Sequence, residues 1–192
     1  MTPRRLKLSS ILAGLALGAL LLLAWTQPWV VLTLDDGSDL SVGGDVAAPA
    51  QPALALAALA LFASISIAGR FFRFVLGVLA AAIGGVIVLL AVPVVSDPVA
   101  AASPAITEAT GLSGDSAIRD LVTASSPTLW PWLSVALGLL LVVLGLLVLA
   151  TQSRWPGSSR KYQAARLETQ DGSAVTDWDA LSEGHDPTGK RE

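Results

Sequence analysis

The sequence predicts an all-α integral membrane protein with four transmembrane helices in a bundle and both termini in the cytoplasm. Of its 192 residues, 53% are hydrophobic and only 14% are charged, whereas soluble domains usually contain about 25% charged residues. Four long stretches contain no charged residue, and the connections between them alternate between basic and acidic. These observations predict the protein class, the number of helices and their direction.

Each uncharged stretch is long enough to cross a bilayer. A hydrocarbon core about 30 Å thick needs roughly 20 apolar residues at about 1.5 Å per residue. The predicted spans are residues 8–25, 52–69, 74–95 and 129–151. We expect the first to be a retained anchor rather than a signal peptide, because bulky residues beginning with Trp25 follow it in place of a small-residue cleavage site.

The connections predict the orientation in the cell membrane. The N-terminal segment 1–7, the turn 70–73 and the tail 152–192 contain the membrane-flanking cations Arg4, Arg5, Lys7, Arg70, Arg73, Arg154, Arg160, Lys161 and Arg166. The two longer loops, 26–51 and 96–128, contain one cation, Arg119, and the acids Asp35, Asp36, Asp39, Asp45, Asp97, Glu108, Asp115 and Asp120. Because cytoplasmic connections carry an excess of lysine and arginine, both termini are predicted to be cytoplasmic and both acidic loops external.

Small residues at helical spacing predict close packing of the spans, since helices in lipid associate where small side chains let backbones approach. The candidates are Gly14 and Gly18; Ala60, Ser64 and Ala68; Gly77, Ala81 and Gly85; and Ser134 and Gly138. The outer loops are rich in Gly, Pro, Ser and Thr and are expected to be irregular, apart from a short helix near 115–124 capped by Asp115.

Four tryptophans flank the predicted outer side of the membrane: Trp25, Trp29, Trp130 and Trp132. One interpretation is an aromatic site that stacks a planar ligand such as an indole. The other is an interfacial belt, because the amphipathic indole ring favours the headgroup level. Trp155, with Phe71, Phe72 and Phe74, is expected to form the matching belt on the cytoplasmic side.

Enzymatic chemistry is not expected. The chain has no cysteine and one histidine, and it contains no phosphate-binding loop, zinc-protease motif or nucleophile elbow. The acids that begin at Asp177 do not match the spacing of a calcium loop. We therefore predict no catalytic residue, no metal site and no cofactor. Nucleic acid is not an expected partner, because the net charge is −3.

The tail divides by charge. Its first part is basic and is expected to lie on the inner leaflet, whereas the part from Glu168 onward contains seven acids and is expected to project into the cytoplasm. Within it, DWDALSEGHDPT has the features of a short helix that forms on docking, with Trp178 and Leu181 on one face. The predicted docking residues are Asp177, Trp178, Asp179, Leu181, Glu183, Gly184, Asp186 and Pro187.

Four segments resemble those of a known family: WTQPWV ending the first span, TLWPW opening the fourth, RKY after it, and the closing DWDALSEGHDPT. Over nearly its full length the chain resembles the tryptophan-biosynthesis-associated membrane proteins, a family of small actinobacterial integral membrane proteins. The family is named for its gene neighbourhood, so the resemblance implies no activity and no catalytic residue. It implies that the closing peptide is a recurrent family ending, which favours a docking role.

Two functional hypotheses follow. The first is a non-enzymatic membrane protein, associated with tryptophan biosynthesis, whose tail docks a cytoplasmic protein. The alternative is a carrier or sensor for tryptophan, indole or a related aromatic metabolite at the outer tryptophans. The expected partners are the lipid bilayer and a cytoplasmic protein, and a homo-oligomer is left open.

Overall fold

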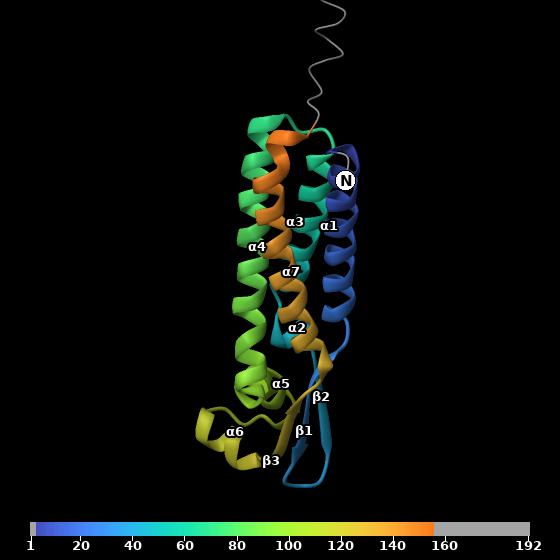
Figure 1. Ribbon diagram of the computed structural model, residues 1–192. Coiled ribbons are helices and arrows are strands. Elements are labelled where there is room, and N and C mark those ends of the chain that lie inside the picture. Colours follow the sequence, from blue (N-terminus) through green and yellow to red (C-terminus); the bar gives the residue numbers. More distant parts are fainter. Residues whose placement is uncertain (1–2, 156–192) are drawn as a thin grey trace, which may run out of the picture. The chain divides into compact units, whose positions relative to one another are not determined.

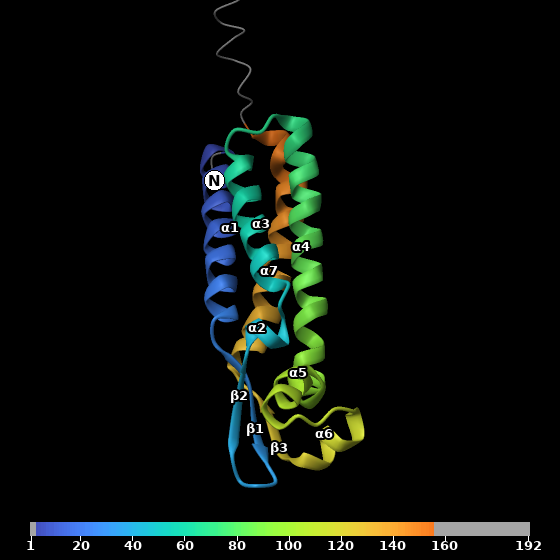
Figure 2. The ribbon, with the colours of Figure 1, turned by 180° about the vertical axis from the view of Figure 1, so that it is seen from behind.

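The computed structural model describes residues 3–155, and the tail from residue 156 lies outside the described residues. Four helices form a bundle: α1 (Pro3–Trp25), α3 (Gln51–Ile65), α4 (Arg70–Ser96) and α7 (Leu129–Thr151), the last followed by the 3-10 turn η1 (Gln152–Arg154). Three strands and three short helices lie at one end, which we call the outer end (Figures 1 and 2). The N-terminus and the α3–α4 turn lie at the other, the inner end (Figure 1).

Three helices, α1, α4 and α7, are long and apolar enough to cross a membrane. The structure is therefore that of a mostly helical membrane protein with a small sheet, which the all-α prediction omitted. Helix α3 has 15 residues and is shorter than the predicted span 52–69. Near its end the hydroxyls of Ser64 and Ser66 donate to the carbonyls of Ala60 and Ala63, and such local bonds compete with continued helix. The number of four crossings stays a prediction.

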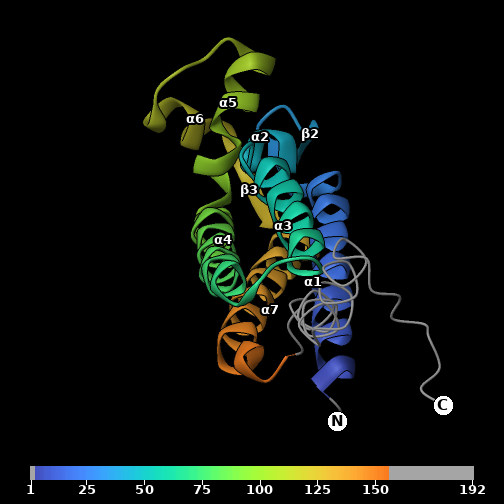
Figure 3. The same ribbon diagram turned by 90° about the horizontal axis from the view of Figure 1, so that it is seen from above.

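Helix α3 runs antiparallel to α1 and is attached to it at both ends. At the outer end the Gln51 Nε2 donates to the carbonyl of Leu21 at 3.1 Å. At the inner end the Lys7 Nζ donates to the carbonyl of Ser66 at 2.7 Å. Viewed along the bundle, the helices follow the order α1, α3, α4, α7 around a common core (Figure 3). Thus α3 accompanies α1 over nearly the whole stretch between Lys7 and Leu21.

Helices α4 and α7 make the closest contact in the bundle, backbone against backbone. A Cβ added to Gly84 would lie 2.6 Å from the carbonyl oxygen of Gly138, and one added to Gly145 would lie 2.6 Å from the amide nitrogen of Ala81. The prediction that Gly85 belongs to the packing face of α4 is wrong, because a Cβ there would meet nothing within 4 Å. The adjacent Gly84 makes the contact instead. Gly77 and Gly138 do face the partner helix, as predicted.

Helices α1 and α3 pack through glycines of α1 and large side chains of α3. Phe62 lies against Gly14, and Leu59 lies against Gly18, where an added Cβ would be 2.8 Å from the leucine Cδ2. The predicted contact face of α3 is wrong: Ala60 and Ser64 are exposed, whereas the buried face consists of Ala55, Ala58, Leu61, Phe62 and Ile65. The two faces look alike in sequence because α3 is uniformly apolar.

The outer end contains an antiparallel sheet of strand order β2-β1-β3, formed by β1 (Pro28–Leu34), β2 (Asp39–Gly43) and β3 (Val122–Pro127). Val31 of β1 pairs with Ser41 on one side and Ser126 on the other. The β1–β2 hairpin turns at Gly37, whose φ of 80° favours glycine. The expectation of irregular loops is thus wrong. Strand β3 has a polar, exposed sequence and is ordered by pairing with β1.

The sheet encloses a second core with α2 (Gly44–Ala47), α5 (Pro98–Thr110), α6 (Asp115–Leu121) and the outer end of α4. Trp29, Val30, Leu32 and Val42 from the sheet meet Ile106 of α5 and Ile118 of α6 there. The predicted helix near 115–124 begins where expected but ends at Leu121, and Gly114 rather than Asp115 occupies the capping position.

Asp97 joins α5 to α6. Its Oδ1 accepts a hydrogen bond from the N–H of Ala100 at 3.1 Å, which caps the first turn of α5. Its Oδ2 forms an ion pair with Arg119, the single cation of the two acidic loops. The bonds from Arg119 and Ala100 stabilise the charged carboxylate and hold the pKa of Asp97 below its usual value of 3.8.

This attachment predicts an acid-sensitive outer end. A carboxyl whose pKa is lowered by folding stabilises the folded state above its ordinary pKa, and this stabilisation is lost as the pH falls towards the folded value. Asp97→Asn should therefore flatten the loss of thermal stability below about pH 5, measured by unfolding scans from neutral pH to about pH 3. Glu108→Gln, on the exposed side of the same helix, is the control. An unchanged acid limb in Asp97→Asn would contradict the assignment.

Candidate functional site

The bundle and the outer sheet are joined by the segments 25–29 and 128–132, which we call the junction. The Thr128 N–H donates to the carbonyl of Trp29 at 2.8 Å, and the Thr128 hydroxyl donates to the carbonyl of Pro28 at 2.7 Å. The same hydroxyl oxygen accepts from the N–H of Trp130 at 3.3 Å and caps α7. One threonine thus ties together two tryptophan-proline segments that are 100 residues apart.

Trp29 is the central side chain of the junction. The β1–β2 register shifts between Pro28 and Val30, and such a bulge re-aims the side chain at that point. The indole of Trp29 is consequently buried in the outer core, where its Nε1 donates to the carbonyl of Ala24 at 2.7 Å. Gly44 packs so closely that an added Cβ would lie 2.9 Å from that Nε1. Trp29 therefore serves as the packed connection between α1 and the sheet.

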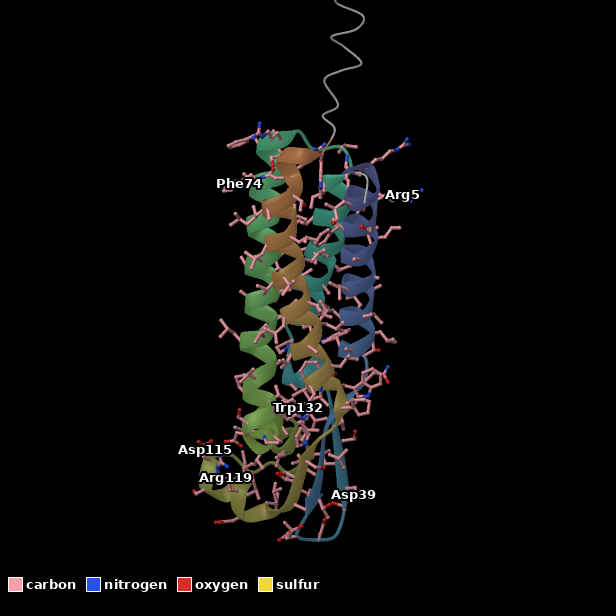
Figure 4. The ribbon with its side chains drawn as sticks, viewed as in Figure 1. Arg5, Asp39, Phe74, Asp115, Arg119 and Trp132 are labelled. Carbon is pink, nitrogen blue, oxygen red and sulfur yellow. The ribbon has the colours of Figure 1, made fainter. Side chains whose placement is uncertain are left out.

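The other three outer tryptophans occupy different environments. Trp25 is half-buried, and its Nε1 is buried with no hydrogen-bond partner among the described residues. Trp130 packs against the outer core. Trp132 is 54% exposed at the outer end of the bundle (Figure 4), where a membrane interface would place an amphipathic ring. The structure brings the four residues to one junction, where Trp29 is buried and Trp132 is exposed.

A polar contact lies beneath the junction, inside the bundle. Gln51 is fully buried at the start of α3, and its Nε2 donates to the Leu21 carbonyl and, at 3.2 Å, to the Ser134 hydroxyl oxygen. It thereby connects α1, α3 and α7. Its Oε1 is buried and has no partner among the described residues. Sequence reasoning missed Gln51, because the residue stands at the edge of a loop, before a proline, and has no motif around it.

One known protein family matches nearly the whole chain. The family model described as tryptophan-associated transmembrane protein matches residues 11–188. The chain belongs to this family. Neither the curated proteins nor the solved structures contain a match.

The family match also includes the closing peptide of this tryptophan-associated transmembrane protein. It reaches Thr188, the last residue of DWDALSEGHDPT. The predicted docking residues, namely Asp177, Trp178, Asp179, Leu181, Glu183, Gly184, Asp186 and Pro187, lie outside the described residues. The match therefore supports the tail peptide as a feature of the family.

Aromatic residues at the inner end do not behave as one group. Phe71, Phe72 and Phe74 are exposed, as residues at a lipid interface would be; Phe74 is labelled at the inner end in Figure 4. Trp155 is buried instead, and the Arg73 guanidinium carbon lies 5.8 Å from the centroid of its ring. A cation over an aromatic face is attracted by the ring's quadrupole. Trp155 thus helps to hold η1 against the first turns of α4.

Proposed function

We propose that this tryptophan-associated transmembrane protein is a non-enzymatic, four-span protein of the cell membrane that docks a cytoplasmic protein of tryptophan biosynthesis through its tail. The observation that carries this proposal is DWDALSEGHDPT, an amphipathic peptide at the end of a chain that is otherwise largely apolar. Trp178 and Leu181 are the apolar anchors, and Asp177, Asp179, Glu183 and Asp186 form the charged rim. Aromatic anchors of this kind dominate the energetics of many interfaces.

The proposed topology is supported by the course of α3. Because α3 is attached to α1 at both Leu21 and Lys7, any bilayer that α1 crosses must surround α3 over nearly the same thickness. Four crossings place both ends of the chain on one side. The charges agree with this arrangement: Arg5 lies at the inner end, and Asp39 and Asp115 lie at the outer end (Figure 4). By the positive-inside rule the inner end is cytoplasmic.

The burial of Trp29 at the junction argues against the carrier hypothesis. Trp29, which the carrier hypothesis needs as a ligand contact, has its indole packed inside the outer core and its Nε1 bonded to Ala24. The carrier or sensor for tryptophan, indole or a related metabolite remains the second candidate on one observation: the buried Trp25 Nε1 and Gln51 Oε1 lack partners among the described residues. The carrier or sensor hypothesis predicts that Trp25→Leu and Trp132→Leu change the flux or binding of indole while leaving tail-dependent capture of a soluble protein intact.

The docking proposal is tested by mild cross-linking in native membranes, followed by purification of the full-length protein and of a form truncated after Gln170. A soluble protein captured only by the full-length chain is the expected result. Trp178→Ala should reduce capture by about 30-fold, which corresponds to an anchor of about 2 kcal/mol. Tyr162→Ala, an aromatic substitution in the membrane-proximal tail, is the matched control. Full capture by Trp178→Ala would overturn the proposed anchor.

A further inference from the structure

A pocket of about 360 Å³ opens at the inner end of the bundle, between the start of α1 and the end of α3. It is lined by Arg4, Lys7, Leu8, Ile11 and Ser66. The lining from α1 is basic at Arg4 and Lys7, which we call the basic wall, and apolar at Leu8 and Ile11, which we call the apolar wall. Both walls lie on one face of α1, because these four residues are spaced i, i+3, i+4 and i+7.

The basic wall is held in place by the fold. The Lys7 Nζ donates to the Ser66 carbonyl at 2.7 Å, and this carbonyl follows the last turn of α3. Lys7 is therefore fixed across the opening, whereas Arg4 is exposed one turn earlier. Arg73 of α4 is near enough to act electrostatically on Lys7.

No carboxylate of the bundle offsets this charge. The sequence contains no Asp or Glu from Met1 to Leu34, from Val46 to Ser96 or from Leu121 to Leu167, so α1, α3, α4 and α7 contain none. Cations gathered in a concave site attract an anion, and a phosphate oxygen accepts strong, charge-assisted hydrogen bonds from arginine and lysine.

The apolar wall identifies the source of that phosphate. Leu8 and Ile11 continue from the cations into the membrane-spanning part of α1, so a ligand that fills the pocket must be charged at its head and apolar below. We propose that the pocket binds the headgroup of an anionic phospholipid, with its phosphate at Arg4 and Lys7 and its acyl chain along Leu8 and Ile11. Basic pockets between membrane helices on the cytoplasmic side bind such headgroups in general. The proposal does not depend on the tail's docking role.

The test uses the purified full-length protein in a neutral detergent. Added phosphatidylglycerol should raise the melting temperature in a saturable manner and remain bound in native mass spectrometry, whereas phosphatidylcholine should do neither. Arg4→Gln should weaken lipid binding about fivefold, the factor expected for losing one cation beside a headgroup. Arg5→Gln is the matched control, because Arg5 is adjacent and equally charged but does not line the pocket. Figure 4 labels Arg5 at the inner end of the bundle.

Lys7→Gln provides a second variant, but it also removes the bond to Ser66, so its lipid binding is measured by mass spectrometry rather than by stability alone. Equal losses in Arg4→Gln and Arg5→Gln would show nonspecific surface attraction and overturn the proposal. Equal stabilisation by inorganic phosphate would assign the site to the free anion. Lipid binding that appears only after truncation at Gln170 would assign the pocket to the acidic tail.

Discussion

Gly84→Val is expected to force α4 and α7 apart and to lower the free energy of unfolding by about 3 kcal/mol, at the upper end of the usual cost of overpacking. The Cβ would lie 2.6 Å from the Gly138 carbonyl oxygen and 2.7 Å from the Val142 amide nitrogen. Both are backbone atoms, so no side-chain rotation can relieve the contact. Helices in lipid gain little from hydrophobicity, and the loss of close packing removes the main attraction between them.

Gly85→Val provides the matched control for this prediction. It changes the adjacent residue of the same helix to the same side chain, but its Cβ would meet nothing within 4 Å. Unfolding of both variants in mixed detergent micelles with increasing dodecyl sulfate measures the difference. Similar destabilisation by both substitutions would mean that helix propensity, not the α4–α7 contact, sets the cost.

Trp29→Ala is expected to unfold the outer sheet while leaving the bundle assembled. Removing a buried tryptophan costs about 3–5 kcal/mol, and Trp29 is fully buried beside Val30, Leu32 and Val42. Its Nε1 also supplies the bond to Ala24 that attaches the sheet to α1. Trp29→Phe should cost less than Trp29→Ala, because a six-membered ring remains in the core while the second ring of the indole and the hydrogen bond to Ala24 are lost.

Hydrogen exchange of the backbone amides measures this prediction. Trp29→Ala should raise exchange in β1, β2 and α2 but leave the protection of α4 and α7 nearly unchanged. Trp132→Ala is the control, since it removes the same side chain from the same junction at a position that is 54% exposed. Equal exchange in Trp29→Ala and Trp132→Ala would contradict the role of Trp29 as the packed connection.

The helices α1, α4 and α7 were predictable because the signal for them is local. A run of uncharged apolar residues has a favourable free energy of transfer into lipid whatever surrounds it. Helix α3 carries the same composition, but its end depends on Ser64 and Ser66, whose hydroxyls bond to nearby carbonyls. The membrane class and the family therefore follow from the sequence, whereas the limits of α3 do not.

The outer sheet was not predictable, because its strands form through pairing between distant parts of the sequence. The segment Val122–Pro127 contains Thr, Ala and Ser residues that favour no regular structure alone, and it becomes a strand only by pairing with β1, almost 100 residues earlier. The apolar run of β1 stands at the start of the predicted loop 26–51, and a bulge at Trp29 interrupts its pairing with β2. Long-range pairing decides such elements.

The same division applies to the residues of the junction and the pocket. The tryptophans, the glycines and the closing peptide are visible as residue types and spacings, and charge counting predicts which loops share a side of the membrane. Tertiary contacts alone decide that Trp29 is buried while Trp132 is exposed, that Gly84 rather than Gly85 meets α7, and that Gln51 and Thr128 join distant segments. The free energy of transfer into lipid is a property of each residue, so the sequence alone predicts the spans. Whether a side chain is buried depends on which helix or strand lies opposite it, so only the tertiary structure decides this.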